Sequence, residues 1–550
     1  MTMNVNITSP VETAVLDEAH IGHIHGAFGT IAKDDHAPRR DWRGKLQTLL
    51  AIIGPGLIVM VGDNDAGAFG TYTQAGQNYG TTLLWTLPLL IPVLYVNQEM
   101  VLRLGAVTGV GHARLILERF GKFWGAFSVI DLFLLNALTI VTEFIGVSLA
   151  LDYLGLPKSL GVAVAALAIM AAAGTGDFRR FERFAVTLCI GSLLLVPIFV
   201  AAHPPLGAIV HDSLIPSLPK GAKLSDVMLL VIGVVGTTIA PWQLFFQQSY
   251  VIDKRITPRF IAYERADLWI GIVFVMIGAI AMMAFAAQVF ANRPDFGNFT
   301  DAAGVAAGLE AYAGRLPAAL FAIALIDASV IGAMAVSLST AYAIGDVMAL
   351  RHSLHREPAE AKGFYAVYCG LIAVAAALVL TPSAPIGLLT NTVQALAGVL
   401  LPSATVFLLL LCNDRAVLGP WVNGKALNAF TGAVIAVLVT LSVVLTASVL
   451  FPDAIDAKAI GFIVAGCSGL ACIATLATWF VGRRSGDETR RISAVDALLR
   501  ETWRMPPLAK LPPAKLSWSS QIWMAALRAY LVLAAGLVLI RIVLLAFGGH

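Results

Sequence analysis

The chain has 550 residues, of which 58% are hydrophobic and only 13% are charged, and its mean hydropathy is +0.81. Soluble domains carry about 25% charged residues, so this composition excludes an ordinary soluble protein and indicates a multi-pass membrane protein. The net charge of +3 gives no reason to expect a nucleic-acid partner, and the five cysteines form no CxxC pair or disulfide framework.

The first 48 residues are polar and mixed in charge. They lack an apolar core followed by a small-residue cleavage site, so we expect a cytoplasmic N-terminal tail over 1–48 and not a signal peptide. Part of this tail is rich in histidine and aspartate but has neither helical spacing nor cysteines: His20, His23, His25, Asp34, Asp35 and His36. We therefore favour a disordered tail over a metal-collecting segment.

The first apolar run, 49–75, is interrupted at Gly62-Asp63-Asn64-Asp65-Ala66-Gly67. A carboxylate at the centre of a bilayer costs roughly 2.5 kcal/mol or more, so acids at this depth indicate a functional site. Each glycine costs about 1 kcal/mol in a helix interior, which favours an unwound helix here. Unwinding frees carbonyl groups beside the carboxylates, and such oxygen ligands suit a hard cation.

Eleven further apolar runs follow, and a helix needs about 20 apolar residues to span the hydrocarbon. They are 82–102, 124–152, 159–174, 182–202, 227–250, 267–291, 316–348, 363–381, 386–412, 428–451 and 460–482. Basic residues concentrate in alternate loops and in the N-terminal segment, which predicts a cytoplasmic N-terminus by the positive-inside rule. We expect a plasma or inner membrane protein with 12 or 13 spans.

The sixth run is interrupted as well, at Ala240-Pro241-Trp242-Gln243, because proline removes a backbone donor and clashes with the preceding turn. Two interrupted spans separated by five predict two inverted repeats with a site at their interface. The expected fold is therefore an all-α, leucine-transporter-like core of five plus five helices.

These elements divide the chain into a core of spans 1–10 over 49–412 and spans 11 and 12 over 413–482. A charged and proline-rich cytoplasmic linker is expected over 483–521. The segment 522–550 contains a thirteenth apolar run at 522–547, but it carries Arg528 and Arg541, so both a short span and an interfacial helix stay open.

Several stretches resemble the natural resistance-associated macrophage protein (NRAMP) family of divalent-metal transporters, over roughly residues 45–480. The stretches that carry the resemblance are Gly54-Pro55-Gly56, residues 103–109, Glu118-Arg119-Phe120-Gly121, residues 178–182, Asn413-Asp414-Arg415 and Trp421-Val422-Asn423. Within the site, Asp65-Ala66-Gly67-Ala68 falls on the family's Asp-Pro-Gly-Asn metal motif. Ala240-Pro241-Trp242-Gln243 falls on its Met-Pro-His-Asn motif.

The chain departs from the family pattern in one direction. Ala240 replaces a thioether ligand that favours softer ions, whereas Mg²⁺ prefers oxygen and keeps several waters. In the third span, Ile140 and Glu143 fall on a pair of acids that conducts protons, so half of that route is missing. Gln247 falls on a histidine. The chain therefore looks like the NRAMP-related magnesium transporter branch, which implies Mg²⁺ and Mn²⁺ uptake without obligatory proton coupling.

Asp65 is the first candidate metal ligand, and its alternative role is an aspartate that faces a polar vestibule. Asp63 is a ligand or a solvent-reaching acid with equal weight, and Asn64 either caps the second half-helix, which we favour, or reaches a hydrated ion. The remaining candidates complete the predicted set: carbonyls of Thr237 and Ala240 freed by the break, Gln243, Gln394 in the tenth span, and Glu143 as a proton or polar pathway.

The predicted function is import of Mg²⁺ or Mn²⁺ by alternating access, with the ion as substrate and without a resident cofactor. The first alternative is a proton-coupled Mn²⁺/Fe²⁺ symporter of the NRAMP type. The second is an amine or amino-acid transporter of the same fold, although Asp63 and Asp65 would repel a carboxylate. An enzyme is not expected, because none of the ten histidines lies in the middle of a span to form a catalytic or metal cluster.

Overall fold

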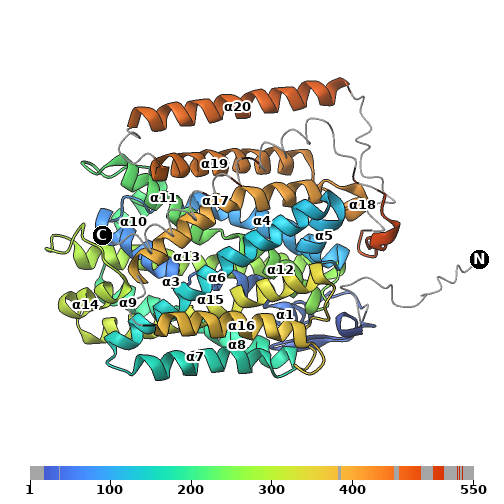
Figure 1. Cartoon of the computed structure of the whole chain (residues 1–550), viewed down its shortest axis with the longest axis horizontal. Helices are drawn as coiled ribbons and strands as arrows, with labels where there is room; N and C mark the ends of the chain where they lie inside the picture. Colours follow the sequence, from blue (N-terminus) through green and yellow to red (C-terminus); the bar gives the residue numbers. More distant parts are fainter. Residues whose placement is uncertain are drawn as a thin grey trace, which may run out of the picture.

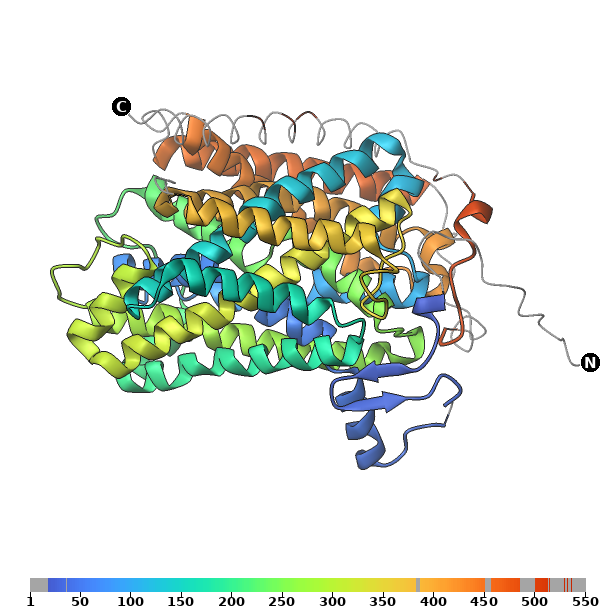
Figure 2. The ribbon, with the colours of Figure 1, turned by 60° about the horizontal axis from the view of Figure 1, so that its bottom comes forward.

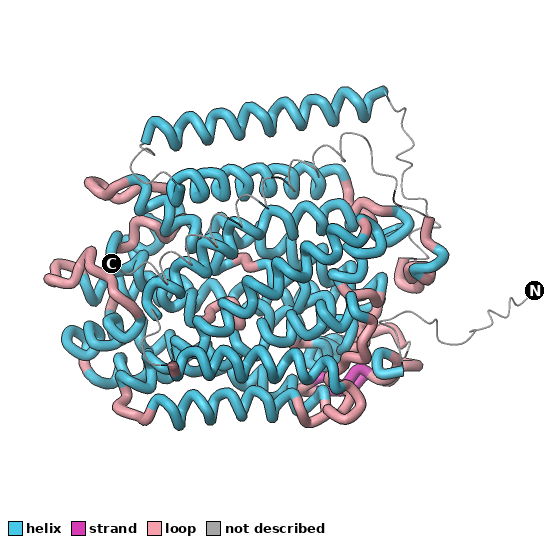
Figure 3. The backbone as a smooth tube through the Cα atoms, in the orientation of Figure 1, coloured by secondary structure: helices cyan, strands magenta, loops and turns pink. Residues whose placement is uncertain are grey.

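The structure is a computed structural model that describes residues 18–35, 37–381, 386–450, 457–484 and 500–512, with isolated positions beyond them. Its helices run side by side along the long axis of the molecule (Figure 1). In the described part of the chain, the only strands form one short hairpin (Figure 3). The predicted all-α membrane architecture is confirmed, with this hairpin as an addition.

The N-terminal hairpin comprises β1 (Ile24–Gly26) and β2 (Gly29–Ile31), which pair antiparallel, and it follows the short helix η1 (Glu18–His20). It projects from one end of the bundle (Figure 2). The backbone N–H of Ala27 donates to Glu182 Oε2 at 2.7 Å, and Arg255 donates to the carbonyls of Ala19 and His23. The prediction of a disordered tail is therefore wrong for residues 18–35, whereas His36 lies outside the described residues.

The first membrane segment begins earlier than predicted, because α1 (Trp42–Ile52) starts within the expected tail. Asp41 caps it by accepting a hydrogen bond from the Gly44 N–H at 3.0 Å. The segment bends by 53° before α2 (Pro55–Val61). At the bend, Gly54 has a φ of 156° and lies against Glu182 and Lys254, so a side chain would be strained and would lack room.

All twelve predicted runs fall on helices. After α2 the membrane helices are α3 (Ala66–Tyr79), α4 (Thr86–Thr108), α6 (Lys122–Tyr153), α7 (Lys158–Ala173), α8 (Phe178–Gly191), α9 (Leu195–Ala202), α11 (Leu224–Thr238), α12 (Pro241–Asp253), α13 (Ile261–Phe290), α15 (Arg315–Met348), α16 (Lys362–Leu380), α17 (Ile386–Cys412), α19 (Lys425–Leu450) and α20 (Ala457–Arg484). The short connecting elements are α5 (His112–Phe120), η2 (Ser192–Leu194), α10 (Leu206–Leu214), η3 (Pro258–Phe260), α14 (Ala302–Ala313), α18 (Arg415–Leu418), η4 (Gly419–Trp421) and η5 (Leu508–Lys510).

By length and composition alone, eight helical segments of the described chain can cross a membrane, or up to ten if each of two bent pairs is one span. Helix α7 and the stretch Lys458–Ile473 within α20 are apolar over a shorter length. A helix of 16 residues rises only about 24 Å, less than the ~30 Å hydrocarbon thickness. The predicted set of twelve spans therefore includes one helix, α7, that is short for a bilayer, whereas α20 has 28 residues.

The interrupted first span lies at the centre of the bundle. The largest helix–helix contacts are those of α15 with α6 and of α13 with α2 and α3. Gly56 permits the close approach of α2 to α13, because a Cβ there would collide with the backbone of Leu268. At the edge of the bundle, α20 packs against α19 (Figure 1). The ends carrying α1, α5 and α18 gather on one side, and α10 and α14 lie at the other (Figure 1).

Residues 500–512, which we call the C-terminal strap, return to the bundle instead of forming a free linker. The Met505 N–H donates to the Val107 carbonyl at 3.3 Å, and Arg119 donates to the Pro512 carbonyl at 2.6 Å. The strap therefore contacts the ends of α4 and α5. Residues 485–499, and the predicted extra span at 522–547 apart from isolated positions, lie outside the described residues.

Candidate functional site

The interruption in the first span lies between Val61, where α2 ends, and Ala66, where α3 begins. Asp65 is the N-cap of α3, with extended backbone, and its Oδ1 accepts a hydrogen bond from the Ala68 N–H at 2.8 Å. A carboxylate at a helix N-terminus satisfies an orphan donor and complements the helix dipole. The predicted interruption is thus present, and the leading candidate residue sits at its edge.

Asn64 does not cap the second half-helix, contrary to our preferred interpretation. Its Nδ2 donates to the Val275 carbonyl of α13 at 3.1 Å, while its Oδ1 is buried and has no hydrogen-bond partner among the described residues. Asparagine and aspartate are equally good caps, so the choice depends on which of the two adjacent residues carries the extended backbone. Here that residue is Asp65.

The interruption in the sixth span separates α11, which ends at Thr238, from α12, which begins at Pro241. In a continuous helix the Thr237 carbonyl would receive the N–H of residue 241, but proline has none. The Ala240 carbonyl was predicted to be free as well, but it accepts a hydrogen bond from the Gln243 N–H at 3.2 Å in the first turn of α12. The break therefore frees the Thr237 carbonyl but not that of Ala240.

The two interruptions face each other. Helix α11 packs against α3, α12 packs against α2, and the Trp242 ring lies close to Gly62. The hydroxyl groups of Tyr72 and Thr238 are hydrogen-bonded at 2.7 Å, which links α3 to the end of α11 at the second break. This juxtaposition is the one that the two-repeat interpretation predicts.

A buried amide network lines this junction. Gln243 Nε2 donates to the Thr238 carbonyl at 3.4 Å, and Gln98 Nε2 of α4 donates to Gln243 Oε1 at 3.0 Å. The Asp63 carboxylate also interacts with the Gln243 side chain, and it lies close enough to Asp65 for the two charges to repel. Asp63, Asp65 and Gln243 are all buried. The structure therefore brings these three predicted residues together.

Glu143 of α6 belongs to the same site. Its Oε2 accepts a hydrogen bond from the Ala66 N–H at 3.1 Å, and its carboxyl group interacts with that of Asp65. Both side chains lie against Gly332 of α15. A Cβ added to Gly332 would lie 2.8 Å from Glu143 Cδ and 3.0 Å from Asp65 Cβ. Glu143 therefore has a titratable neighbour, Asp65, although the second acid of its own span is missing.

Several polar atoms in this region are buried without a hydrogen-bond partner among the described residues: Asp63 Oδ2, Asn64 Oδ1, Gln98 Oε1, Glu143 Oε1, Thr237 Oγ1, and Oε1 and Nε2 of Gln247. Buried polar groups are normally satisfied, so a concentration of orphaned oxygens indicates a place where a cation or water binds. In the described residues, no group of three or more His, Cys, Asp or Glu side chains is arranged to hold a metal ion. Amide, carbonyl and water oxygens must therefore complete any ion site here.

The side chain of Gln394 lies outside the described residues, although its helix α17 packs against α11 and α3. Gln98 and Tyr72 were missed by the sequence analysis. The polar triplet Asn97-Gln98-Glu99 within the second apolar run was a usable signal for the first, whereas nothing in the sequence distinguishes Tyr72 from other membrane tyrosines.

A second buried charge cluster holds the other end of α2. Lys254 Nζ donates to Glu182 Oε1 at 2.7 Å and to the Ile52 and Ile53 carbonyls at 2.6 and 2.9 Å. Asp267 of α13 accepts the N–H groups of Gly54, Gly56 and Leu57 at 3.1, 2.7 and 3.2 Å. The Asp267 carboxylate thus caps the N-terminus of α2 from a neighbouring helix. The dipole of α2 stabilises the negative charge at this position.

The chain matches the family model described as "Natural resistance-associated macrophage protein-like" over residues 56–448. It is 29% identical over 406 residues to "Divalent metal cation transporter MntH" of Ralstonia nicotianae, covering 71% of this chain and 89% of that protein. It is 25% identical to the protein of the same name from Latilactobacillus sakei, covering 69% and 85% of the two chains.

Among solved structures, the fold is similar to that of the Eremococcus coleocola manganese transporter, with a TM-score of 0.62 and 20% identity over 83% of this chain and 97% of that one. A structure of a point mutant of the same transporter matches with the same TM-score and coverage, at 19% identity. This similarity confirms the leucine-transporter-like fold class.

Proposed function

Because this chain belongs to the natural resistance-associated macrophage protein family, we propose that it carries divalent metal cations across a membrane by alternating access at its two interrupted spans. The observation that carries the proposal is the meeting of the Asp65 carboxylate with the helix break at Pro241, in a region of orphaned buried oxygens. Relatives named as divalent metal cation transporters support the same function.

The transported ion is Mg²⁺ or Mn²⁺, as in the NRAMP-related magnesium transporter branch. Asp65, Asp63, Gln243 and the Thr237 carbonyl supply oxygen, and the Asn64 side-chain oxygen is within the same region. Ala240 offers no sulfur, which removes the preference for softer ions, and its small side chain leaves room for a partly hydrated Mg²⁺. Gln394 stays a predicted ligand.

Transport proceeds without obligatory proton coupling. Two adjacent buried carboxyl groups are not both ionised unless a cation lies between them, so the pair of Glu143 and Asp65 holds one proton, and this proton stays on Glu143 when the metal binds Asp65. Farther along the route, Ile140 and Gln247 do not titrate. The driving force is the ion gradient and the membrane potential, which supplies roughly 2.3 kcal/mol per charge per 100 mV.

The two alternatives are weaker. A proton-coupled Mn²⁺/Fe²⁺ symporter would need titrating groups beyond the carboxyl pair, and Ile140 and Gln247 do not provide them. An amino-acid transporter of this fold would bring a carboxylate against Asp63 and Asp65, where like charges repel. The relatives are transporters and not enzymes.

We also propose a plasma-membrane location with the N-terminal hairpin on the cytoplasmic side, from the distribution of basic loops.

A proteoliposome assay tests the function. The full chain is reconstituted, and uptake of Mg²⁺, Mn²⁺ and Ca²⁺ is measured while the internal pH is recorded. We expect uptake of Mg²⁺ and Mn²⁺ that increases with an inside-negative potential and leaves the internal pH unchanged. The absence of uptake of every divalent ion by folded protein would overturn the proposal, and a fixed ratio of protons to metal would overturn the uncoupled mechanism.

A further inference from the structure

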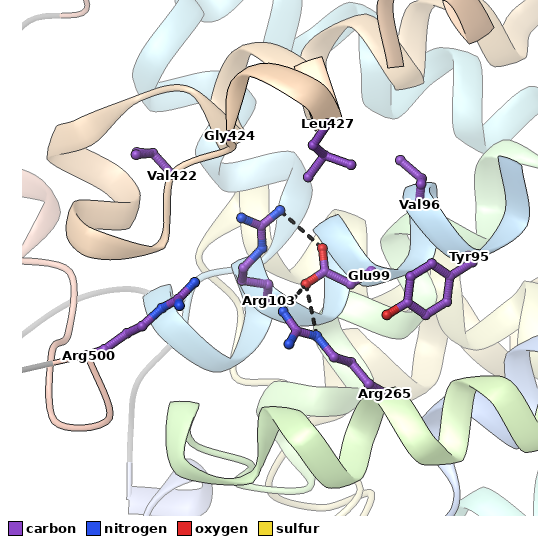
Figure 4. Close-up of a pocket in the computed structure, with 9 residues that line it drawn as sticks. All are labelled: Tyr95, Val96, Glu99, Arg103, Arg265, Val422, Gly424, Leu427 and Arg500. Atoms are coloured by element: carbon purple, nitrogen blue, oxygen red, sulfur yellow. Dashed lines mark hydrogen bonds and ion pairs between the residues drawn. The ribbon is translucent and has the colours of Figure 1, made fainter. Parts of the chain in front are cut away.

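A cavity of about 270 Å³ lies outside the metal region, between the second half of α4, the beginning of α13, the loop before α19 and the C-terminal strap (Figure 4). Its lining residues are Tyr95, Val96, Glu99, Arg103, Arg265, Val422, Gly424, Leu427 and Arg500. None of the residues assigned above to metal transport lines it. The cavity therefore needs a separate explanation.

The charges that line the cavity do not cancel. Glu99 Oε1 accepts from Arg265 at 2.5 and 3.1 Å, and Glu99 Oε2 lies 3.1 Å from the Arg103 guanidinium. Both carboxylate oxygens are thus used by two of the arginines, as the dashed lines in Figure 4 show. Among the described residues, Arg500 forms no ion pair with a carboxylate. Three guanidinium groups and one carboxylate leave a surplus of two positive charges around the cavity.

The third arginine is fixed in place. The Arg500 guanidinium lies over the Trp421 ring, 4.1 Å from its centroid, and the Arg500 carbonyl accepts from Trp421 Nε1 at 2.8 Å. Its Nε is buried without a hydrogen-bond partner in the described part of the chain. Burial lowers the pKa of Arg500, and the guanidinium groups of Arg265 and Arg103 lower it further. An anion in the cavity would relieve this repulsion.

Arg103 is also held in advance of any ligand. Its guanidinium donates to the Trp421 carbonyl and, at 2.6 Å, to Asn423 Oδ1, while its Nε is buried and unpartnered among the described residues. Guanidinium groups present several N–H donors in a planar fork that matches phosphate oxygens. Preorganised donors lose little side-chain entropy when a ligand arrives.

We propose that this cavity binds a phosphate-bearing anion between Arg103, Arg265 and Arg500. Its volume is slightly below the 300–1,000 Å³ range of sites for drug-sized molecules, so it suits a phosphate group with a small substituent. Such a group occurs in the headgroup of an anionic phospholipid and in a soluble phosphate ester. The Tyr95 ring at the cavity stacks on the half-exposed Trp269 with centroids 4.8 Å apart, and aromatic pairs of this kind mark the headgroup level of a bilayer.

Occupation of the cavity has a structural consequence. Arg265 belongs to α13, Arg103 to α4 and Arg500 to the C-terminal strap, so one anion would join three segments that are far apart in the sequence. The strap would be bound more tightly to the bundle when the ligand is present. This inference is independent of the transported ion.

Binding by the purified full chain in an uncharged detergent tests the inference. The lipid arm compares phosphatidylglycerol with neutral phosphatidylcholine by native mass spectrometry, and the soluble arm measures the change in Tm with inorganic phosphate and glycerol 1-phosphate. The test variant is Arg500→Gln. The matched control is Lys510→Gln, which removes one positive charge from the same strap but lies outside the cavity lining.

We expect Arg500→Gln to weaken anion binding roughly ten-fold or more, since a hydrogen bond to a charged group contributes at least that factor, and Lys510→Gln to bind like the wild type. Phosphatidylglycerol binding alone identifies a lipid headgroup, and binding of the soluble phosphates as well identifies a free ester. If Arg500→Gln fails to fold, Arg265→Gln serves the same comparison. Equal losses in Lys510→Gln, or no preference of the wild type for any phosphate-bearing anion over phosphatidylcholine, would overturn the inference.

Discussion

Glu143 accepts a hydrogen bond from the backbone N–H of Ala66 at 3.1 Å, directly at the start of the second half of the first span. This contact holds the Glu143 carboxyl group beside that of Asp65 and fixes the unwound backbone to α6. In the proposed mechanism, a proton and the metal ion compete for this pair of carboxyl groups. The proposed mechanism depends on how this competition is resolved.

Asp65→Asn should abolish metal uptake while the protein stays folded. Asparagine preserves the N-cap of α3, so the change removes the charge and keeps the hydrogen bond to Ala68. Asp65→Ala should also abolish uptake and should lower the free energy of unfolding by about 1 kcal/mol, because the cap is lost. Uptake into proteoliposomes and thermal unfolding of both variants provide the measurements.

The control for this experiment is Asp327→Asn, which makes the same change in α15 away from the site. It should transport like the wild type. Wild-type uptake by Asp65→Asn would remove Asp65 from the site.

Ala240→Met should shift the preference from Mg²⁺ toward Mn²⁺ and Cd²⁺. A thioether at this buried position would add a soft ligand, and the ratio of Cd²⁺ to Mg²⁺ uptake should rise roughly ten-fold. Ala240→Leu adds similar volume without sulfur and separates the ligand effect from the steric one. If both variants change the ratio equally, or neither does, Ala240 does not face the ion.

Metal influx should respond to the membrane potential without acidifying the lumen of the liposome. The carboxyl pair can take up and release a proton locally, but the residues at 140 and 247 cannot pass it on. A pH-sensitive dye inside the liposomes, read during Mg²⁺ uptake at two imposed potentials, measures both quantities. Metal-dependent acidification in a fixed proportion to uptake that disappears in Glu143→Gln would show that a coupled proton path survives.

Acidification should loosen the N-terminal hairpin through His355, whose ring centroid lies 6.5 Å from that of His25 in β1. Its ring stacks on Phe178 with centroids 5.0 Å apart and hydrogen-bonds the Asp253 carbonyl at 3.1 Å. Burial lowers the pKa of His355 to about 4, with the Asp253 carboxylate acting against this shift and Arg255 and His20 acting with it. The unfolded chain binds a proton near pH 6.5 that the folded chain does not, so stability is full above pH 6.5 and falls as the pH drops toward 4.

Hydrogen exchange of residues 18–35 between pH 7 and pH 4, corrected for the intrinsic exchange rate, measures this effect. His355→Gln keeps a donor for the Asp253 carbonyl but cannot titrate, so its pH dependence should be smaller. Burial acts to lower the pKa of His352, but Asp346, which lies 3.2 Å away, raises it overall. The contribution of His352 to the stability of the folded chain therefore changes only above pH 6.5. An unchanged pH dependence in His355→Gln would contradict the assignment, and the exposed His211→Gln is the control.

The sequence predicted the parts of the site that depend on local chemistry. Gly62 and Gly67 weaken a helix and Pro241 removes a backbone donor, so both interruptions could be located without a structure. The choice between Asn64 and Asp65 as the cap could not be made, because it depends on one backbone angle. The contact of Gln98 with Gln243 joins helices that are 145 residues apart, and no local pattern specifies it.

The N-terminal hairpin and the C-terminal strap were missed for a related reason. Neither has a hydrophobic pattern of its own, and both are ordered by distant residues: Glu182 and Arg255 hold the hairpin, and Trp421 and Arg119 hold the strap. Composition describes the segment alone, whereas its order comes from donors and acceptors elsewhere in the chain.

Helix α2 is tied to α13 at both ends. Asp267 accepts three N–H groups at the beginning of α2, and Asn64, just beyond its end, donates to the Val275 carbonyl. A short helix that is held at two points turns together with its support, so we expect α2 and α13 to move as one unit in the proposed transport cycle. In that cycle the bend at Gly54 and the unwound residues before Ala66 would act as hinges, and the movement of this unit would change which side of the membrane the Asp65 carboxylate faces.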